Sequence, residues 1–345
     1  MLSQILKIIR LLGLRKAARM KKHHEQGLEF VRGYAATCCW WTLLNHGFLD
    51  KLAQNGSASL DTYAAQYGLQ PDVLHALVEY LHGIGLLHYA PPLVRLSEKG
   101  KILLAEPRGL FELLWAYEPC FAALPDLLTR TKKYGRDLTR RITWVGLGSG
   151  RLCEQLPYPV LRRMILDRRC QMVLDLGCGD LALLAGLCRL NPKIRGHGVD
   201  CESDMVRYNQ KLLAQNDFNR RLTVQQADIF HLPALPPDLP PIGCITACDT
   251  FHEYLGNQSV LIQLLQDLKK RFPNALFVIG EFCRQDPGWL LRHPTASLEH
   301  HLFHQLSGQP IGSAQQWRDL FRQAGLTILE EQIFDLIGHG YFALK

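Results

Sequence analysis

From residue 172 to the C-terminus, short apolar segments alternate with segments of helical periodicity. We expect strands at 172–176, 196–200, 223–227, 244–248, 275–281, 327–334 and 339–344, and helices at 181–190, 203–215, 260–272 and 314–324. Strands that alternate with helices are typical of parallel sheets covered on both faces. The sequence therefore predicts an α/β fold with a Rossmann-like, doubly wound, mostly parallel sheet.

The part before this region is predicted to be mainly helical. Ser59 is an expected N-cap for a helix at 62–67, and Pro71 opens another helix that runs to Gly83. Two short strands, 86–89 and 93–96, follow as a hairpin. This order indicates a winged helix. We place the boundary near 150, with a helical domain at 1–150 for dimerisation and pocket lining and a second domain at 151–345. The glycine-rich stretch 146–150 is interpreted as a linker.

Charge and composition limit the partners. The net charge of +7 is spread along the chain, and the expected second helix of the winged helix, 71–82, contains no Arg or Lys. Helices that read DNA need cationic and amide side chains, so nucleic acid binding is disfavoured. Eleven cysteines without a CxxC pair suit a reducing cytoplasm. Residues 1–22 are predicted to form a basic amphipathic helix, for which packing against protein is favoured over peripheral membrane contact.

A glycine pair stands where the first strand of the C-terminal region ends. The segment 173–180 reads VLDLGCGD, which places Gly177 and Gly179 at a turn that a ligand must approach closely. Asp200 ends the second strand at the distance expected of an acid that binds ribose hydroxyls, and Asp228 and Ile229 follow the third. Nicotinamide-dependent reductases share such a turn, but the third glycine of their longer fingerprint is Leu181 here.

Asp175, Gly177 and Gly179, with Asp200 and Asp228 in the same order, resemble the class I methyltransferases that use S-adenosylmethionine (SAM). The resemblance implies that Asp175 and the glycine turn hold the methionine part of SAM. It also implies that Asp200 accepts the ribose hydroxyls, and that Asp228, with Ile229 beside it, receives the adenine.

The acceptor side also resembles a known group. Together with the predicted winged helix, the segment 249–254, DTFHEY, is similar to the small-molecule O-methyltransferases, in which a histidine at the position of His252 is the general base. That resemblance implies a homodimer, a small organic acceptor, and methylation of a hydroxyl or enol with His252 and Glu253 as catalytic residues.

Two alternatives stay open. The histidines in 298–306, LEHHLFHQL, are similar to a metal-dependent branch that methylates carbon in α-keto acids. In that branch His252 and His304, with His301 as substitute for His304, would hold a divalent or iron ion. The other alternative is a winged-helix regulator that senses SAM without turnover.

Overall fold

The computed structural model describes residues 2–293, 295 and 297–345. The chain folds into two compact units, Met1–Pro107 and Arg108–Lys345. This division differs from the boundary expected near 150, because helices α7 (Arg108–Ala122) and α9 (Ile142–Cys153) pack closely against each other within the second unit. The linker expected at 146–150 is wrong, since these residues lie inside α9.

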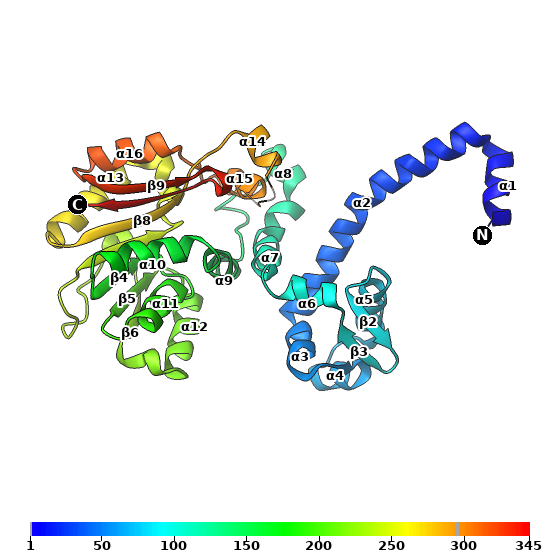
Figure 1. The fold of residues 1–345 in the computed structure, drawn as a ribbon, viewed down its shortest axis with the longest axis horizontal. Coiled ribbons are helices and arrows are strands. Elements are labelled where there is room, and N and C mark those ends of the chain that lie inside the picture. The colour runs from blue at the N-terminus through cyan, green and yellow to red at the C-terminus, as the bar shows by residue number, and fades with distance from the viewer. Residues whose placement is uncertain (1, 294, 296) are drawn as a thin grey trace. The chain divides into compact units, whose positions relative to one another are not determined.

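The first unit is built from helices and a small sheet (Figure 1). After α1 (Leu2–Leu12) and α2 (Leu14–Asn45) come α3 (Phe48–Asn55), β1 (Ala58–Ser59), α4 (Leu60–Tyr67), α5 (Pro71–Gly83), β2 (Leu87–Ala90), β3 (Leu93–Leu96) and α6 (Glu98–Leu104). The sheet order is β1-β3-β2, with antiparallel pairs. As expected, the Ser59 side chain accepts a hydrogen bond at the start of α4. Ser97 does the same at the start of α6.

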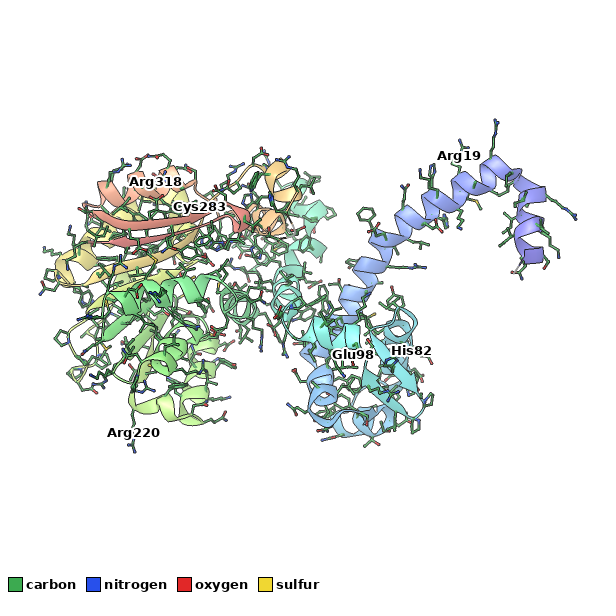
Figure 2. The ribbon with its side chains drawn as sticks, in the orientation of Figure 1. Arg19, His82, Glu98, Arg220, Cys283 and Arg318 are labelled. Atoms are coloured by element: carbon green, nitrogen blue, oxygen red, sulfur yellow. The ribbon has the colours of Figure 1, made fainter. Side chains whose placement is uncertain are left out.

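The basic N-terminal segment forms two helices in place of the single one expected. Gly13, with a φ of 77°, separates α1 from α2, a backbone conformation that glycine adopts at no steric cost. Arg19 projects from α2 as an exposed side chain (Figure 2). Met1 of the predicted segment lies outside the described residues. Within the described part of the chain, every helix is too short or too polar to span a bilayer.

The second unit is centred on a seven-stranded sheet of order β6-β5-β4-β7-β8-β10-β9. Its strands are β4 (Met172–Leu176), β5 (Arg195–Asp200), β6 (Leu222–Gln226), β7 (Cys244–Cys248), β8 (Leu276–Phe282), β9 (Ile328–Phe334) and β10 (His339–Leu344). The first five in the spatial order are parallel, whereas β10 runs antiparallel to both neighbours. This confirms the predicted Rossmann-like class.

Helices cover both faces of this sheet (Figure 1). One apolar core joins the sheet to α13 (Gln258–Arg271) and α16 (Ala314–Gln323), and the other joins it to α10 (Pro157–Asp167) and α11 (Ala182–Leu190). In chain order, α8 (Leu124–Leu128) follows α7, and α12 (Ser203–Ala214) follows β5. Helices α14 (Pro287–Leu291) and α15 (Ser297–Leu306) follow β8. The parallel strands therefore present their carboxyl ends together at one edge.

Helix α9 approaches its neighbours through its glycines. A Cβ atom on Gly148 would lie 2.9 Å from the backbone nitrogen of Leu113, and one on Gly150 would lie 2.5 Å from a carboxylate oxygen of Asp180. Since real Cβ atoms almost never come this close, only glycine permits the packing. The glycines bring α9 against both α7 and the turn that follows β4.

Candidate active site

The turn after β4 lies where the strand order reverses, between β5 and β7. Gly177 has a φ of 71°, and a Cβ atom there would lie 2.6 Å from Oγ1 of Thr250. The backbone N–H groups of Gly177 and Cys178 both donate to the carbonyl oxygen of Val199, at 2.8 and 3.0 Å. Ligands of doubly wound sheets bind at such a switch point, so the turn is in the expected place.

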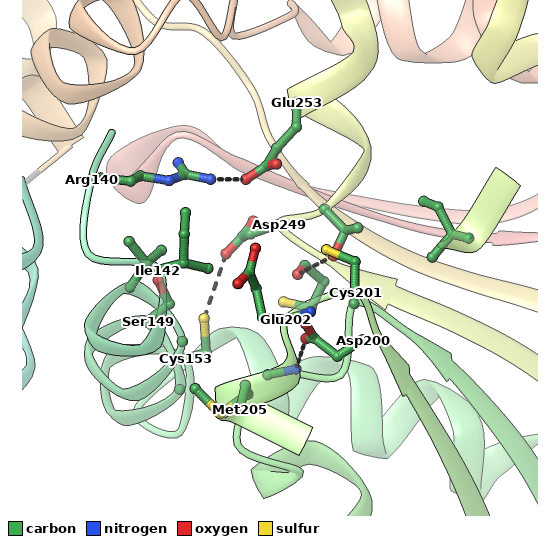
Figure 3. A pocket seen from close by; sticks show the side chains of 18 of the residues that line it. Arg140, Ile142, Ser149, Cys153, Asp200, Cys201, Glu202, Met205, Asp249 and Glu253 are labelled. Carbon is green, nitrogen blue, oxygen red and sulfur yellow. Dashed lines mark hydrogen bonds and ion pairs between the residues drawn. The ribbon is translucent and has the colours of Figure 1, made fainter. Parts of the chain in front are cut away.

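Asp200 is tied to this turn by its carboxylate. Its Oδ2 accepts the N–H of Gly179 at 3.0 Å, and its Oδ1 accepts the N–H of Glu202 at 2.9 Å (Figure 3). Burial raises the pKa of Asp200, although both hydrogen bonds oppose the shift. The carboxylate is thus held in one orientation at the end of β5, and it faces a cavity.

That cavity lies over the carboxyl ends of the strands, where ligands of such sheets bind. Gly177, Gly179, Asp200, Asp228 and Ile229 all line it, together with Cys201, Glu202, Met205, Thr250 and Tyr254. The structure therefore brings together five of the six residues predicted to bind the cofactor. Asp228 also caps a short 3₁₀ helix by accepting the N–H of Phe230 at 2.9 Å.

Asp175, the sixth, is buried within β4 and is absent from the lining of this cavity. Burial raises its pKa to about 8, and the nearby charges of Asp200 and Asp180 add to the shift. Its carboxyl group is thus largely protonated near neutral pH. The sequence could place Asp175 at the turn but could not indicate that its side chain lies beneath the cavity.

Helix α9 and the residue before its N-cap form the wall opposite the strands. Ile142, Ser149 and Cys153 line the same cavity, and so does Arg140 (Figure 3). Arg140 is 7% exposed and donates to Tyr117 Oη at 2.9 Å, to Gln309 Oε1 at 2.7 Å and to the carboxylate of Glu253. Sequence patterns alone could not show that Arg140 and Glu253, 113 positions apart, form one ion pair.

His252 lies in a short 3₁₀ helix, Phe251–Asn257, directly after β7. It is 2% exposed, and its Nδ1 lies 2.9 Å from Glu281 Oε2. Its Nε2 lies 3.0 Å from Nε2 of His304 on α15. Burial alone would lower the pKa of His252, but the Glu281 carboxylate outweighs it and raises the pKa. Burial and the charge of His252 keep the pKa of His304 well below its usual value.

Glu281 was missed in the sequence although one signal was present, a lone carboxylate in the apolar strand LFVIGEF of β8. It is fully buried, and its Oε1 accepts the backbone N–H of Thr250 at 3.0 Å. Glu281 therefore fixes both the orientation of the His252 ring and the backbone around it.

Two further histidines lie beside this pair. Nε2 of His339 lies 3.1 Å from Oδ1 of Asp249. His300 lines the same recess as His252 and His304. Burial lowers the pKa of His300 to about 4. His301, the predicted substitute ligand, instead lines a separate surface pocket with Arg284 and Leu302.

The histidine recess joins the cofactor cavity. Arg140, Val145, Ser149, Asp249 and Glu253 line both. The site thus has two adjoining halves, one at the glycine turn and one at the histidines, with Glu253 at their junction. Such an arrangement lets a group pass from a bound donor to a bound acceptor.

Comparisons with known proteins agree with this geometry. Residues 169–325 match a family model described as a methyltransferase domain. The chain is 27% identical over 324 residues, 90% of each protein, to 2-ketoarginine methyltransferase of Streptomyces arginensis. Its fold resembles human N-acetylserotonin methyltransferase solved with SAM (TM-score 0.64, 15% identity, 94% of this chain and 97% of that one) and mitomycin 7-O-methyltransferase MmcR (0.64, 14%, 95% and 99%).

The matched family model and the curated relative indicate a SAM-dependent methyltransferase. The chain is an enzyme of this kind, with its methyltransferase domain at residues 169–325 and a separate N-terminal unit.

Proposed function

We propose that this enzyme transfers the methyl group of SAM to the carbon beside the carbonyl group of a small α-keto acid, and that His252 and His304 hold a divalent or iron ion. The observation that carries the proposal is the 3.0 Å separation of the two Nε2 atoms. O-methylation, the first reading of the sequence, becomes the second candidate.

The hydrogen bonds of the two Nδ1 atoms indicate where each ring carries its proton. Nδ1 of His304 lies 2.6 Å from the carbonyl oxygen of His300, which can only accept, so Nδ1 carries the proton. Nδ1 of His252 faces the carboxylate of Glu281 in the same way. In neutral rings both Nε2 atoms then present lone pairs to each other. A proton or a metal ion between them removes the repulsion.

The pair fits a metal ion. Imidazole nitrogens bind zinc at about 2.0–2.1 Å, so two Nε2 atoms 3.0 Å apart are close enough to bind the same ion. A carboxylate on the far ring nitrogen, as Glu281 provides, is the usual support of a ligating histidine. The acceptor would supply further oxygen ligands. A bound ion would polarise the acceptor carbonyl and so acidify the adjoining carbon.

Arg140 supports an acidic acceptor. Its guanidinium is buried in the recess next to the histidines, and its Nε lacks a hydrogen-bond partner among the described residues. A planar guanidinium binds carboxylates well. We propose that Arg140 receives the carboxylate of the acceptor and that Glu253 is then released from its ion pair.

In the cofactor half, we propose that Asp200 accepts the ribose hydroxyls, that Asp228 and Ile229 contact the adenine, and that the turn at Gly177 and Gly179 holds the methionine part, above the buried Asp175. Their common cavity supports these assignments. During transfer, the proton on the acceptor carbon goes to the Glu253 carboxylate. The electron pair of that C–H bond forms the new C–CH₃ bond as the S–CH₃ bond breaks, and S-adenosylhomocysteine leaves.

The second candidate, O-methylation, is favoured by the contact between His252 and Glu281. A histidine oriented by a carboxylate can remove the proton of a hydroxyl as the oxygen takes the methyl group. It requires no metal.

Elemental analysis of the purified protein, followed by an assay with methyl-labelled SAM, tests the proposal. We expect about one metal ion per chain, a loss of that ion in His304→Ala, and retention in His301→Ala, a matched control on the same helix. Product NMR should show a methyl group on carbon. Metal-free protein that methylates oxygen would support the second candidate and overturn the first.

We also propose that the first unit is a winged-helix module for homodimerisation in the cytoplasm. Its order of two helices and a hairpin supports a winged helix, and the exposed side chains of Phe30 and Val31 on α2 support dimerisation. The free state of all eleven cysteines supports a location in the cytoplasm. Light scattering should give twice the chain mass, and a monomer would overturn the proposal. The absence of Arg and Lys from α5 speaks against a DNA-binding regulator, which a gel shift would check.

A further inference from the structure

The histidine recess continues into an extension with a largely apolar lining. Leu113, Ser149, Asp249, Phe282 and His300 line both spaces, so the two adjoin. Beyond them the apolar residues that line the extension are Leu110, Leu152, Leu156, Pro157 and Ile337, and its other lining residues are Cys153, Gln155, Thr295, Ser297 and His339. An acceptor fixed at the histidines therefore has room for its side chain here.

The extension has little negative charge of its own. Asp249 is the one acidic residue among the described residues that line it, and His339 lies 3.1 Å from its Oδ1. Glu281 pairs with His252, and Glu253, which the proposed reaction frees from Arg140, lines the recess and not the extension. A cationic side chain in the extension would therefore find no unpaired carboxylate among the described residues that line it.

We propose that the extension selects α-keto acids with an apolar or aromatic side chain over those with a guanidinium. The inference rests on the proposed function and concerns the part of the acceptor that does not react. It separates this enzyme from its relative, which is named for 2-ketoarginine.

The physical reason is desolvation. A guanidinium that leaves water for this extension loses much of its hydration, and uncharged groups such as those of Thr295 and Ser297 do not compensate its charge as a carboxylate would. An apolar side chain gains free energy from the same transfer. The preference would reverse if Glu253, once freed from Arg140, reached a guanidinium in the extension, and the experiment includes that outcome.

The test is competition between phenylpyruvate and 5-guanidino-2-oxopentanoate for the purified full-length enzyme with SAM. We expect kcat/KM to favour phenylpyruvate at least about tenfold, since burying an unpaired charge costs more than that ratio requires. Equal use of the two acids, or preference for the guanidino acid, would overturn the inference and leave C-methylation intact.

A variant pair sharpens the test. Leu156 is half-buried in the lining of the extension and makes no side-chain cap hydrogen bond to α10, so Leu156→Asp introduces a carboxylate there without breaking one. We expect the ratio of kcat/KM for phenylpyruvate to kcat/KM for the guanidino acid to fall about tenfold in Leu156→Asp. The ratio should change little in Leu156→Asn, because Asn has the shape of Asp without its charge. An unchanged preference in Leu156→Asp would count against the assignment of this extension.

Calorimetric binding with S-adenosylhomocysteine present separates selectivity from chemistry. Tighter binding of phenylpyruvate without methylation would support the selectivity and overturn the proposed reaction. Binding of neither acid would overturn both.

Discussion

Nε2 of His252 and Nε2 of His304 face each other at 3.0 Å, while each ring's Nδ1 is hydrogen-bonded to an oxygen acceptor. The two residues are 52 positions apart, one after β7 and the other on α15. Their pairing depends on Glu281, whose Oε2 lies 2.9 Å from the Nδ1 of His252. The behaviour of the site should therefore respond to changes at Glu281 as well as at the histidines.

Replacing Glu281 by Gln should weaken metal binding without emptying the site. The amide carries no charge and has one accepting oxygen, so it cannot serve both Nδ1 of His252 and the backbone N–H of Thr250. Changes of this kind cost about 10–100-fold in metal affinity. A chelator competition titration measures this. Glu331→Gln, in a partly exposed ion pair with Arg318, is the matched control and should leave affinity unchanged. Equal affinity in both variants would contradict the metal assignment.

Replacing Asp200 by Asn should weaken cofactor binding about 10–100-fold, because hydrogen bonds to a charged acceptor contribute about 1.5–3 kcal/mol. Calorimetric titration with S-adenosylhomocysteine measures the change. Asp204→Asn, an exposed acid on α12 nearby, serves as control. If both variants bind as tightly as the parent, Asp200 does not hold the ribose.

Replacing Gly148 by Ala should destabilise the second unit by about 1–3 kcal/mol, since overpacking costs this much. The new Cβ would meet backbone atoms, 2.9 Å from the nitrogen of Leu113 and 3.0 Å from the carbonyl oxygen of Gly109. Gly146→Ala in the same helix meets the end of the flexible Met205 side chain and should cost less. Urea unfolding compares the two, and equal destabilisation would refute the packing argument.

Asp175 should make the cofactor-free protein less stable as pH rises. Its pKa is raised by burial to about 8 in the fold, against about 3.9 when unfolded, so the folded state binds more protons between these values. Its contribution to stability is complete below about pH 4 and falls by up to about 1.4 kcal/mol per pH unit until about pH 8. Asp175→Asn removes this dependence. Urea unfolding at pH 6, 7 and 8 should show that the free energy of unfolding of the variant rises relative to that of the parent as pH increases. If the two free energies change with pH in parallel, Asp175 is not the source of the dependence.

The alternation of strands and helices could be predicted because the signals are local. Apolar runs and helical periodicity place β4 to β10 within a residue or two of their predicted positions. Gly177 and Asp200 could also be predicted from the sequence, because a glycine turn and the end of a strand require particular residues whatever surrounds them.

Contacts between residues far apart in the chain could not be predicted from the sequence. The glycine-rich stretch 146–150 was predicted to be a linker because it lacks the strand and the lysine of a phosphate loop, yet it lies inside α9, where its glycines pack against Leu113 and Asp180. Glu281 and Arg140 acquire roles only because folding brings β8 to His252 and the segment before α9 to Glu253.

The sequence by itself determined the order of elements, the glycine turn and the acids at the strand ends, since each depends on a few neighbouring residues. The tertiary structure alone decided that His304 faces His252 while His301 turns to another pocket, and that Asp175 lies beneath the cavity. The reason is that burial and charge pairing depend on which segments meet in space, and adjacent positions on one helix point in different directions.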